Sequence, residues 1–405
     1  MRPSLIYAAL LFFFATIVLA GWYLGSAAEP HTGLPPPTTP PLPPTAVRAA
    51  DNPIVVVPPT LPAGSTADPG LRRTPLVLPT MPPLAEEVDE PLPPLVFSRQ
   101  GQIWRSDGSA AAPQQLTNFP STVYAEQPSL APDGSRIAFV ALIQPAIDAS
   151  VPLPRSVLYV LELAGGEPIP IWQPAEGILW LPAWSPDNQA IFLLANRTYS
   201  ADSDADSLAK LQVVRFDLAA AEPLTIVSGA LDPAISPDGS NLAYLQFDAD
   251  GYTMHLDLAA ADGSNPQRVI DGRSFLGFYA PRFSPDGEQI IVAAIEGPET
   301  DEQGYPIVYQ NSDPLRVLRG MLEPRRAAAH GAPWDLWIVN VDGSGLRRLT
   351  FLYEDLPMAA FSPDGREIIM MAFGGFYRMD RDGGNLRRIS DLGDHGGVDW
   401  IRSSE

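Results

Sequence analysis

The amino-acid sequence predicts an all-β fold: a six-bladed β-propeller, closed by N- and C-terminal strands, that follows one transmembrane helix and a proline-rich linker. Three observations predict it. A turn of the form Ser/Ala-Pro-Asp-Gly/Asn recurs five times within residues 95–405, three times as Ser-Pro-Asp-Gly. Short β-type runs surround each copy, and four strands in about 50 residues are the size of one propeller blade. The two ends of this region supply complementary parts of a sixth blade.

Residues 1–28 are predicted to be a signal anchor. The twenty residues Leu5–Leu24 carry no charge, and as a helix they would span about 30 Å, the hydrocarbon thickness of a bilayer. A cleaved signal is the alternative, because a signal peptidase accepts small residues such as those that end at Ala28. Arg2 and the lack of another positive charge before Arg48 favour a cytoplasmic N-terminus. We therefore expect a membrane-anchored propeller that is extracytoplasmic (periplasmic or at the cell surface), or secreted if cleavage follows Ala28.

Residues 29–94 are predicted to be a disordered spacer. They hold 20 of the 46 prolines of the chain. Proline lacks the backbone donor that helices and sheets need, and it favours polyproline II. A proline-rich ligand for an aromatic groove is the alternative interpretation. The short apolar run Ile54–Val57 is the part of the spacer that we expect to dock locally.

The repeated turn is predicted to be structural. Proline presets φ for the first corner of a type I turn, aspartate bonds to nearby amides, and glycine accepts the positive φ that closes the turn. Apolar runs on both sides make each copy a hairpin. Five occurrences at one turn position argue against catalysis by its aspartates, which are Asp133, Asp187, Asp238, Asp286 and Asp364.

The spacing of the turns predicts one insertion and the closure of the ring. Successive turn aspartates lie 54, 51, 48 and 78 residues apart, so the fifth unit carries an insertion at about 296–334. Leu95–Ser98 begins a unit that lacks its first strand, and Val398–Ile401 matches the missing strand. Building one blade from both ends removes a free sheet edge.

The repeats resemble those of a known class. The pattern Pro-x-Trp/Phe-Ser-Pro-Asp-Gly-x-x-Ile-Ala-Phe is similar to the WD-like repeats of TolB-type six-bladed propellers, over most of residues 95–405. TolB carries an α/β domain before its propeller, whereas this chain has an anchor and a linker there. The resemblance implies this fold and a function in binding proteins or peptides. It does not identify a particular partner. Similar repeats occur in the propeller of prolyl-oligopeptidase-like hydrolases, whose catalytic domain these residues do not accommodate.

Charge and residue usage exclude several kinds of function. Residues 95–405 hold 22 Arg and Lys against 40 Asp and Glu, a net charge of −18, which repels nucleic acid and anionic lipid. The chain has no cysteine, and its four histidines lack paired metal spacing. The acidic run Asp202–Asp206 departs from a calcium loop, because Ser207 and Val213 stand where Gly and Glu are needed. No Gly-x-Ser-x-Gly elbow occurs either. We predict no cofactor and no metal.

Two sets of residues are predicted to bind a partner. The residues just before each first strand should ring the mouth of the central channel, where acidic and aromatic groups suit a cationic peptide or a sugar. By register they include Glu126, Gln127, Trp180, Asp232, Tyr279 and His395. In the insertion, Asp313-Pro314 is typical of a helix start. The arginines that follow form the densest basic cluster of this acidic region: Arg316, Arg319, Arg325 and Arg326. This helix is either a lid or partner dock, or it packs its leucines on the blade.

The sequence thus predicts a non-catalytic extracytoplasmic scaffold, tethered to a membrane, that binds a protein or peptide. The alternative is an enzyme that processes a glycan or peptide with carboxylates at the propeller channel, because general acid–base pairs need no linear motif.

Overall fold

The computed structural model describes residues 86–88, 90–144, 155–174, 177–196, 210–248, 251, 253–301, 303–306 and 334–402. The chain divides into two units, Met1–Pro82 and Pro83–Glu405, and the described residues all belong to the second. The predicted anchor, most of the predicted spacer and the four arginines of the insertion lie outside the described residues. No helix of the described part is long and apolar enough to cross a membrane.

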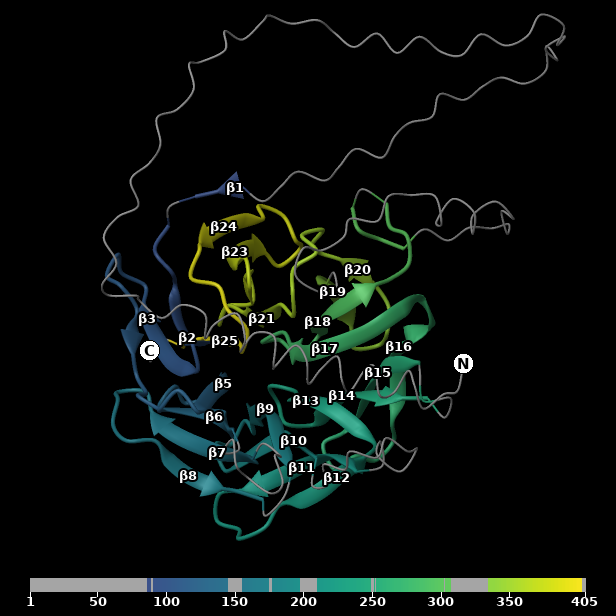
Figure 1. The fold of residues 1–405 in the computed structure, drawn as a ribbon. Coiled ribbons are helices and arrows are strands. Elements are labelled where there is room, and N and C mark those ends of the chain that lie inside the picture. The colour runs from purple at the N-terminus through teal and green to yellow at the C-terminus, as the bar shows by residue number, and fades with distance from the viewer. Residues whose placement is uncertain are drawn as a thin grey trace, which may run out of the picture. The chain divides into compact units, whose positions relative to one another are not determined.

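Six sheets are arranged as the six blades of a β-propeller (Figure 1), as predicted. Blade one holds β2 (Pro94–Arg99), β3 (Gln102–Asp107), β4 (Gln114–Gln115) and β25 (Val398–Trp400). Blade two holds β5 (Val123–Leu130), β6 (Arg136–Ile143), β7 (Arg155–Glu162) and β8 (Ile169–Trp172). Blade three holds β9 (Ile178–Trp184), β10 (Ala190–Asn196), β11 (Leu211–Asp217) and β12 (Leu224–Ser228).

The other three blades repeat this order. Blade four holds β13 (Ala230–Ile235), β14 (Asn241–Phe247), β15 (Met254–Ala260) and β16 (Gln267–Ile270). Blade five holds β17 (Phe275–Phe283), β18 (Gln289–Glu296), β19 (Trp334–Asn340) and β20 (Arg347–Arg348). Blade six holds β21 (Met358–Phe361), β22 (Glu367–Ala372), β23 (Gly375–Asp380), β24 (Arg387–Ser390) and β1 (Glu86–Glu87). A single-turn 3₁₀ helix, η1 (Gly272–Ser274), is the one helix among the described residues.

The repeated turn has the chemistry that the sequence predicts. In blade four, the Ser236 hydroxyl donates to Asp238 Oδ1 at 2.5 Å and accepts the backbone N–H of Asn241 at 2.9 Å. Asp238 Oδ1 also accepts the backbone N–H of Ser240 at 3.0 Å, and Gly239 has a φ of 73°. These bonds lower the pKa of Asp238 to about 2. Bonds within the turn lower the pKa values of Asp133, Asp187 and Asp364 in the same way. The pKa of Asp286 is lowered first by the bond from Arg381 and also by the bonds within its own turn, so all five aspartates serve the hairpins.

The ring closes between the two ends of the propeller, as predicted. β25 pairs antiparallel with β2, with Trp400 opposite Leu95 and Val398 opposite Phe97. The Trp400 indole N–H also donates to the backbone oxygen of Ala360 in blade six at 3.0 Å. The strand β25 therefore bonds both to β2 within blade one and to blade six.

The end of the predicted spacer belongs to the propeller, which corrects the boundary placed at residue 94. β1 pairs in parallel with β24 at the outer edge of blade six. Glu87 forms an ion pair with Arg388 at 2.8 Å, and Glu90 forms ion pairs with Arg387 at 3.0 Å and Arg378 at 3.4 Å. The sequence pattern does not reveal this strand, because its partners are charged side chains about 300 residues away.

Apolar side chains fill the spaces between neighbouring blades. One cluster joins Val96 and Ile103 of blade one to Phe139 of blade two. Another joins Leu245 of blade four to Trp337 of blade five, whose side chain is fully buried. The blades are thus fixed to one another by the hydrophobic effect rather than by main-chain pairing.

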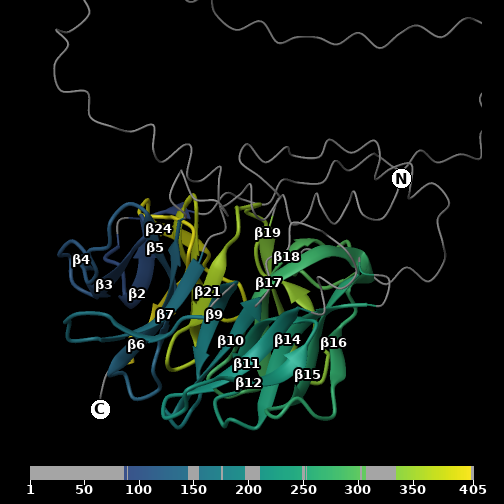
Figure 2. The ribbon, with the colours of Figure 1, turned by 60° about the horizontal axis from the view of Figure 1, so that its bottom comes forward.

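The innermost strands, β5, β9, β13, β17, β21 and β25, each contact the innermost strands of the adjacent blades around the ring. They begin at one end of the ring, which we call the connector face. There β6, β10, β14 and β18 end, as the pairings of Val123 with Ile143 and of Ile178 with Asn196 show. The opposite end carries the repeated turns; Figure 2 shows the blades from the side.

Candidate functional site

A strained residue recurs near the middle of four innermost strands. Gln127, Leu181, Asp232 and Ala280 have φ values of 57°, 47°, 47° and 50°, in the left-handed region that costs a non-glycine residue about 1–3 kcal/mol. The strand register shifts at each of these positions. Each residue precedes a proline, and proline inside a sheet is found essentially at edges and bulges. That proline is the sequence signal from which the bulge could have been predicted.

Two of the residues predicted to bind a partner, Gln127 and Asp232, lie at these bulges and bond to the adjacent blade. Gln127 Oε1 accepts the backbone N–H of Leu181 at 2.7 Å, from blade two to blade three. Asp232 Oδ2 accepts the backbone N–H of Ala280 at 3.1 Å, from blade four to blade five. Both side chains are buried. They hold the blades in place, so they present little to a ligand.

Two predicted aromatic residues lie beside Gln127. The Gln127 side-chain amide donates to Tyr279 Oη at 3.3 Å, and that hydroxyl lies 3.6 Å from Met358 Sδ. The half-buried Trp180 packs against the same cluster. Burial, together with the charges of Asp232 and Glu126, raises the pKa of Tyr279. The structure therefore brings Gln127, Trp180 and Tyr279 together across three blades.

Two carboxyl groups of this region have raised pKa values. Burial raises the pKa of Asp232 to about 7, against the opposing effects of the Ala280 N–H and the charge of Arg282. Burial raises the pKa of Glu126 to about 7 as well, and the negative charge of Asp394 adds to the effect. Groups that titrate near neutral pH are able to give or take a proton there. The sequence does not single out Asp394 and Arg282, because neither belongs to a recognisable motif.

His395 lies in the short segment that leads into β25. Its backbone N–H donates to Asp394 Oδ1 at 2.7 Å, and Asp394 Oδ2 accepts the N–H of Gln100. The His395 ring stacks on Phe373 with centroids 5.4 Å apart. Phe373 is 51% exposed. An exposed aromatic side chain therefore lies beside the acidic residues between blades six and one.

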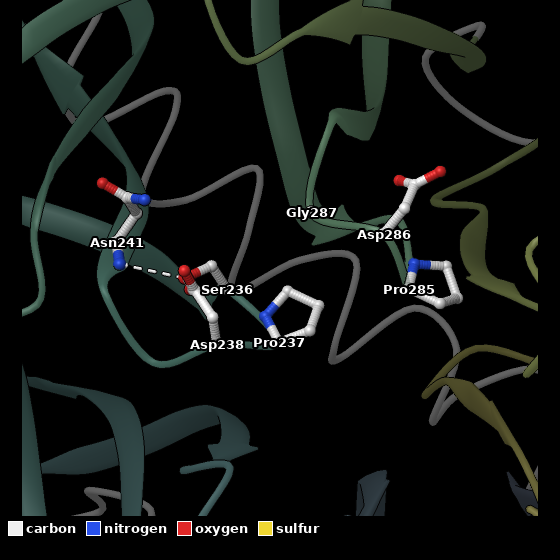
Figure 3. A pocket seen from close by; sticks show the side chains of 7 residues that line it. All are labelled: Ser236, Pro237, Asp238, Asn241, Pro285, Asp286 and Gly287. Carbon is white, nitrogen blue, oxygen red and sulfur yellow. Dashed lines mark hydrogen bonds between the residues drawn. The ribbon is translucent and has the colours of Figure 1, made fainter.

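A hollow on the opposite end of the ring is a weaker candidate. It measures about 330 Å³ and lies between the repeated turns of blades four and five (Figure 3). Its polar groups are already satisfied: Asp238 by Ser236 and Ser240, and Asp286 by Arg381 and Ser284. Figure 3 also shows the bond from the Asn241 N–H to Ser236. No group of three or more acidic or histidine side chains in the described ranges is able to hold a metal ion.

Comparisons with known proteins support the fold. No family model matches the chain. "Uncharacterized peptidase YuxL" of Bacillus subtilis is 31% identical over 150 residues, 35% of this chain and 21% of that protein. "Tol-Pal system protein TolB" of Anaeromyxobacter dehalogenans is 31% identical over 98 residues, 22% of each chain. The chain is similar to TolB over this stretch. It spans about a fifth of the length of these two relatives.

One solved structure supports the same architecture. A chain of the "Crystal structure of Nidogen/Laminin Complex" aligns with a TM-score of 0.51 and 11% identity, over 77% of this chain and 99% of that one. TolB from Acinetobacter baumannii aligns with a TM-score of 0.48 and 17% identity, over 76% and 66% of the two chains. At such low identity, the first of these likenesses supports the fold alone.

Proposed function

We propose that this chain is a membrane-tethered, extracytoplasmic binding scaffold whose propeller engages a protein or peptide at the channel mouth. The observation that carries the proposal is the junction of blades one, two and six on the connector face. There the Glu126 carboxyl makes no hydrogen bond within the described part of the chain, and Phe373 exposes an aromatic ring. A half-buried carboxyl beside an exposed aromatic ring suits a cationic or polar peptide.

The partial likeness to a Tol-Pal system protein supports a binding role for the propeller. The proposed membrane tether is supported by the twenty uncharged residues Leu5–Leu24 and by the proline-rich segment that follows them. The insertion with Arg316, Arg319, Arg325 and Arg326 is proposed as a second contact, because its charge is opposite to that of most of the domain.

Chemical cross-linking and pull-down from native membranes tests the scaffold. The full chain would be compared with Glu126→Gln, with Phe373→Ala and with a chain that lacks 307–333. Leu224→Ala is the matched control, since Leu224 is also an exposed apolar residue (61%) but lies on the outer strand β12. We expect one protein to be captured by the full chain and by the control, and to be reduced at least severalfold by the mouth variants. Equal capture by all variants would contradict a mouth site.

A carboxylate enzyme is the second candidate function. It is favoured by two carboxyl groups, Glu126 and Asp232, whose pKa values lie near 7, and by the partial likeness to a protein named as a peptidase. Incubation of the full chain with a peptide and glycan library tests it. Turnover that Glu126→Gln or Asp232→Asn abolishes would establish the enzyme, and binding without turnover would leave the scaffold.

A further inference from the structure

The segment Asp394–Gly397 packs between blades one and two. The backbone oxygen of Gly396 accepts the N–H of Gln127, and the backbone oxygen of Gly397 accepts the N–H of Ser98 at 3.0 Å. Gly396 has a φ of 113°, in the left-handed half of the map. A Cβ on Gly396 would collide with Ser98 Oγ and lie 3.4 Å from Glu126 Cγ. The side chains of Ser98 and Glu126 therefore both lie against the same glycine.

Neither of these side chains has a hydrogen-bond partner among the described residues. Ser98 is 1% exposed, so its hydroxyl oxygen is hidden from bulk solvent as well. An unpaired buried hydroxyl costs about 1–3 kcal/mol, so such a group is expected to bond to something. The Nδ1 atom of the adjacent His395 is also buried and unpaired within the described ranges.

The charge of the junction selects the kind of ligand. The Glu126 carboxyl interacts with Asp394 from the segment before β25 and with Tyr279 from β17, and no lysine or arginine of the described part contributes to its pKa. A second anion would be repelled there. A cation that donates hydrogen bonds would be attracted by the carboxyl groups and would satisfy Ser98 Oγ. A primary ammonium has both properties, with three N–H donors and one positive charge.

We propose that the junction of Ser98, Glu126 and Asp394 binds a primary ammonium group of a peptide, either its amino terminus or a lysine side chain. This inference rests on the proposed function and names the chemistry that the mouth recognises. Phe373, exposed beside His395, offers a ring face to the ligand on the same side.

Nuclear magnetic resonance of the full chain in detergent, with glutamate labelled at the side-chain carboxyl carbon, tests the site alone. Glu126→Gln assigns its signal. The probe is methylammonium chloride, and tetramethylammonium chloride, which has no N–H, is its match at equal ionic strength. We expect methylammonium to lower the apparent pKa of Glu126 by about half a unit or more, because a nearby positive charge favours the ionised form. An equal effect of the two salts would overturn the proposal.

Three further comparisons sharpen this test. Ser98→Ala should weaken methylammonium binding by about fivefold, the value of one net hydrogen bond, whereas Glu162→Gln, at an exposed position of β7, should leave it unchanged. With a pKa of about 7 for Glu126, binding should be about tenfold tighter at pH 8 than at pH 6. Unchanged affinity in Ser98→Ala, or no dependence on pH, would contradict the assignment of these residues.

Two small peptides distinguish the sources of the ammonium. Glycylglycinamide carries a free amino terminus, and N-acetyl-lysine amide carries only the side-chain amine. Tighter binding of one peptide than of the other identifies the source. N-acetylglycinamide has no amine and is the negative control; if neither peptide binds more tightly than it does, the site is refuted. If these probes fail while the pull-down still depends on Phe373, the ammonium site falls and the scaffold stands.

Discussion

The raised pKa of Asp232 makes a prediction about the pH dependence of stability. Its side chain is only 6% exposed, and burial raises its pKa from 3.8 to about 7. Between these two values the folded chain holds a proton on Asp232 that the unfolded chain has released. The free energy of unfolding therefore falls as the pH rises through this window. At about 1.4 kcal/mol per pH unit, Asp232 costs about 4 kcal/mol above pH 7.

The substitution Asp232→Asn isolates this effect. An asparagine has nearly the same shape, and its Oδ1 is able to accept the N–H of Ala280, as Asp232 Oδ2 does. The variant should match the wild type near pH 4 and exceed it at pH 8, by up to about 4 kcal/mol in the free energy of unfolding. Urea unfolding followed by tryptophan fluorescence at pH 4, 6 and 8 measures this difference.

Asp187→Asn is the control, because its exposed carboxyl has a lowered pKa, through the bonds from Ser185 and Gln189. Stability from a lowered pKa is present above the unfolded value and is lost in acid. The control should therefore lose stability at neutral pH rather than gain it. A difference between Asp232→Asn and the wild type that does not change with pH would refute the reasoning.

The other predictions concern the two ends of the chain. Trp400→Ala should lower the free energy of unfolding of the propeller by about 3–5 kcal/mol, because it removes a buried ring and the bond to Ala360. A melting temperature equal to that of the wild type would contradict closure by β25. Glu90→Gln weakens two ion pairs and should lower the free energy of unfolding by about 1 kcal/mol or less. Limited proteolysis should then cut near β1 sooner, and more so in high salt. Unchanged cleavage would mean that the ion pairs do not hold β1. The full chain should remain in the membrane fraction after a carbonate wash, whereas residues 83–405 should not; a mature N-terminus at Glu29 would instead establish cleavage after Ala28.

Much of the architecture could be predicted from local chemistry that repeats. Each Ser-Pro-Asp-Gly turn is specified by four adjacent residues, so its hairpin is visible without any knowledge of distant contacts. The closure by β25 followed from the same repeats, since Trp400 occupies the position that Trp184 holds in blade three, and each indole donates to a backbone oxygen of the preceding blade. The strand β1 was beyond this reasoning, because a two-residue strand leaves no periodic pattern and the ion pairs of Glu87 with Arg388 and of Glu90 with Arg387 join residues about 300 positions apart.

The candidate site shows the limit of sequence more sharply. Sequence alone determined that Glu126, Gln127 and Asp232 stand at equivalent or adjacent register positions of the innermost strands, because the repeats align there. Only the tertiary structure decided which of their polar atoms are available. Gln127 and Asp232 accept bonds from backbone amides about 50 residues away, whereas the side chains of Glu126 and Ser98, which both lie near Gly396, bond to nothing in the described part. A hydrogen bond depends on distance and direction between groups that only folding brings together. A carboxyl that accepts such a bond and one that does not therefore look alike in the sequence.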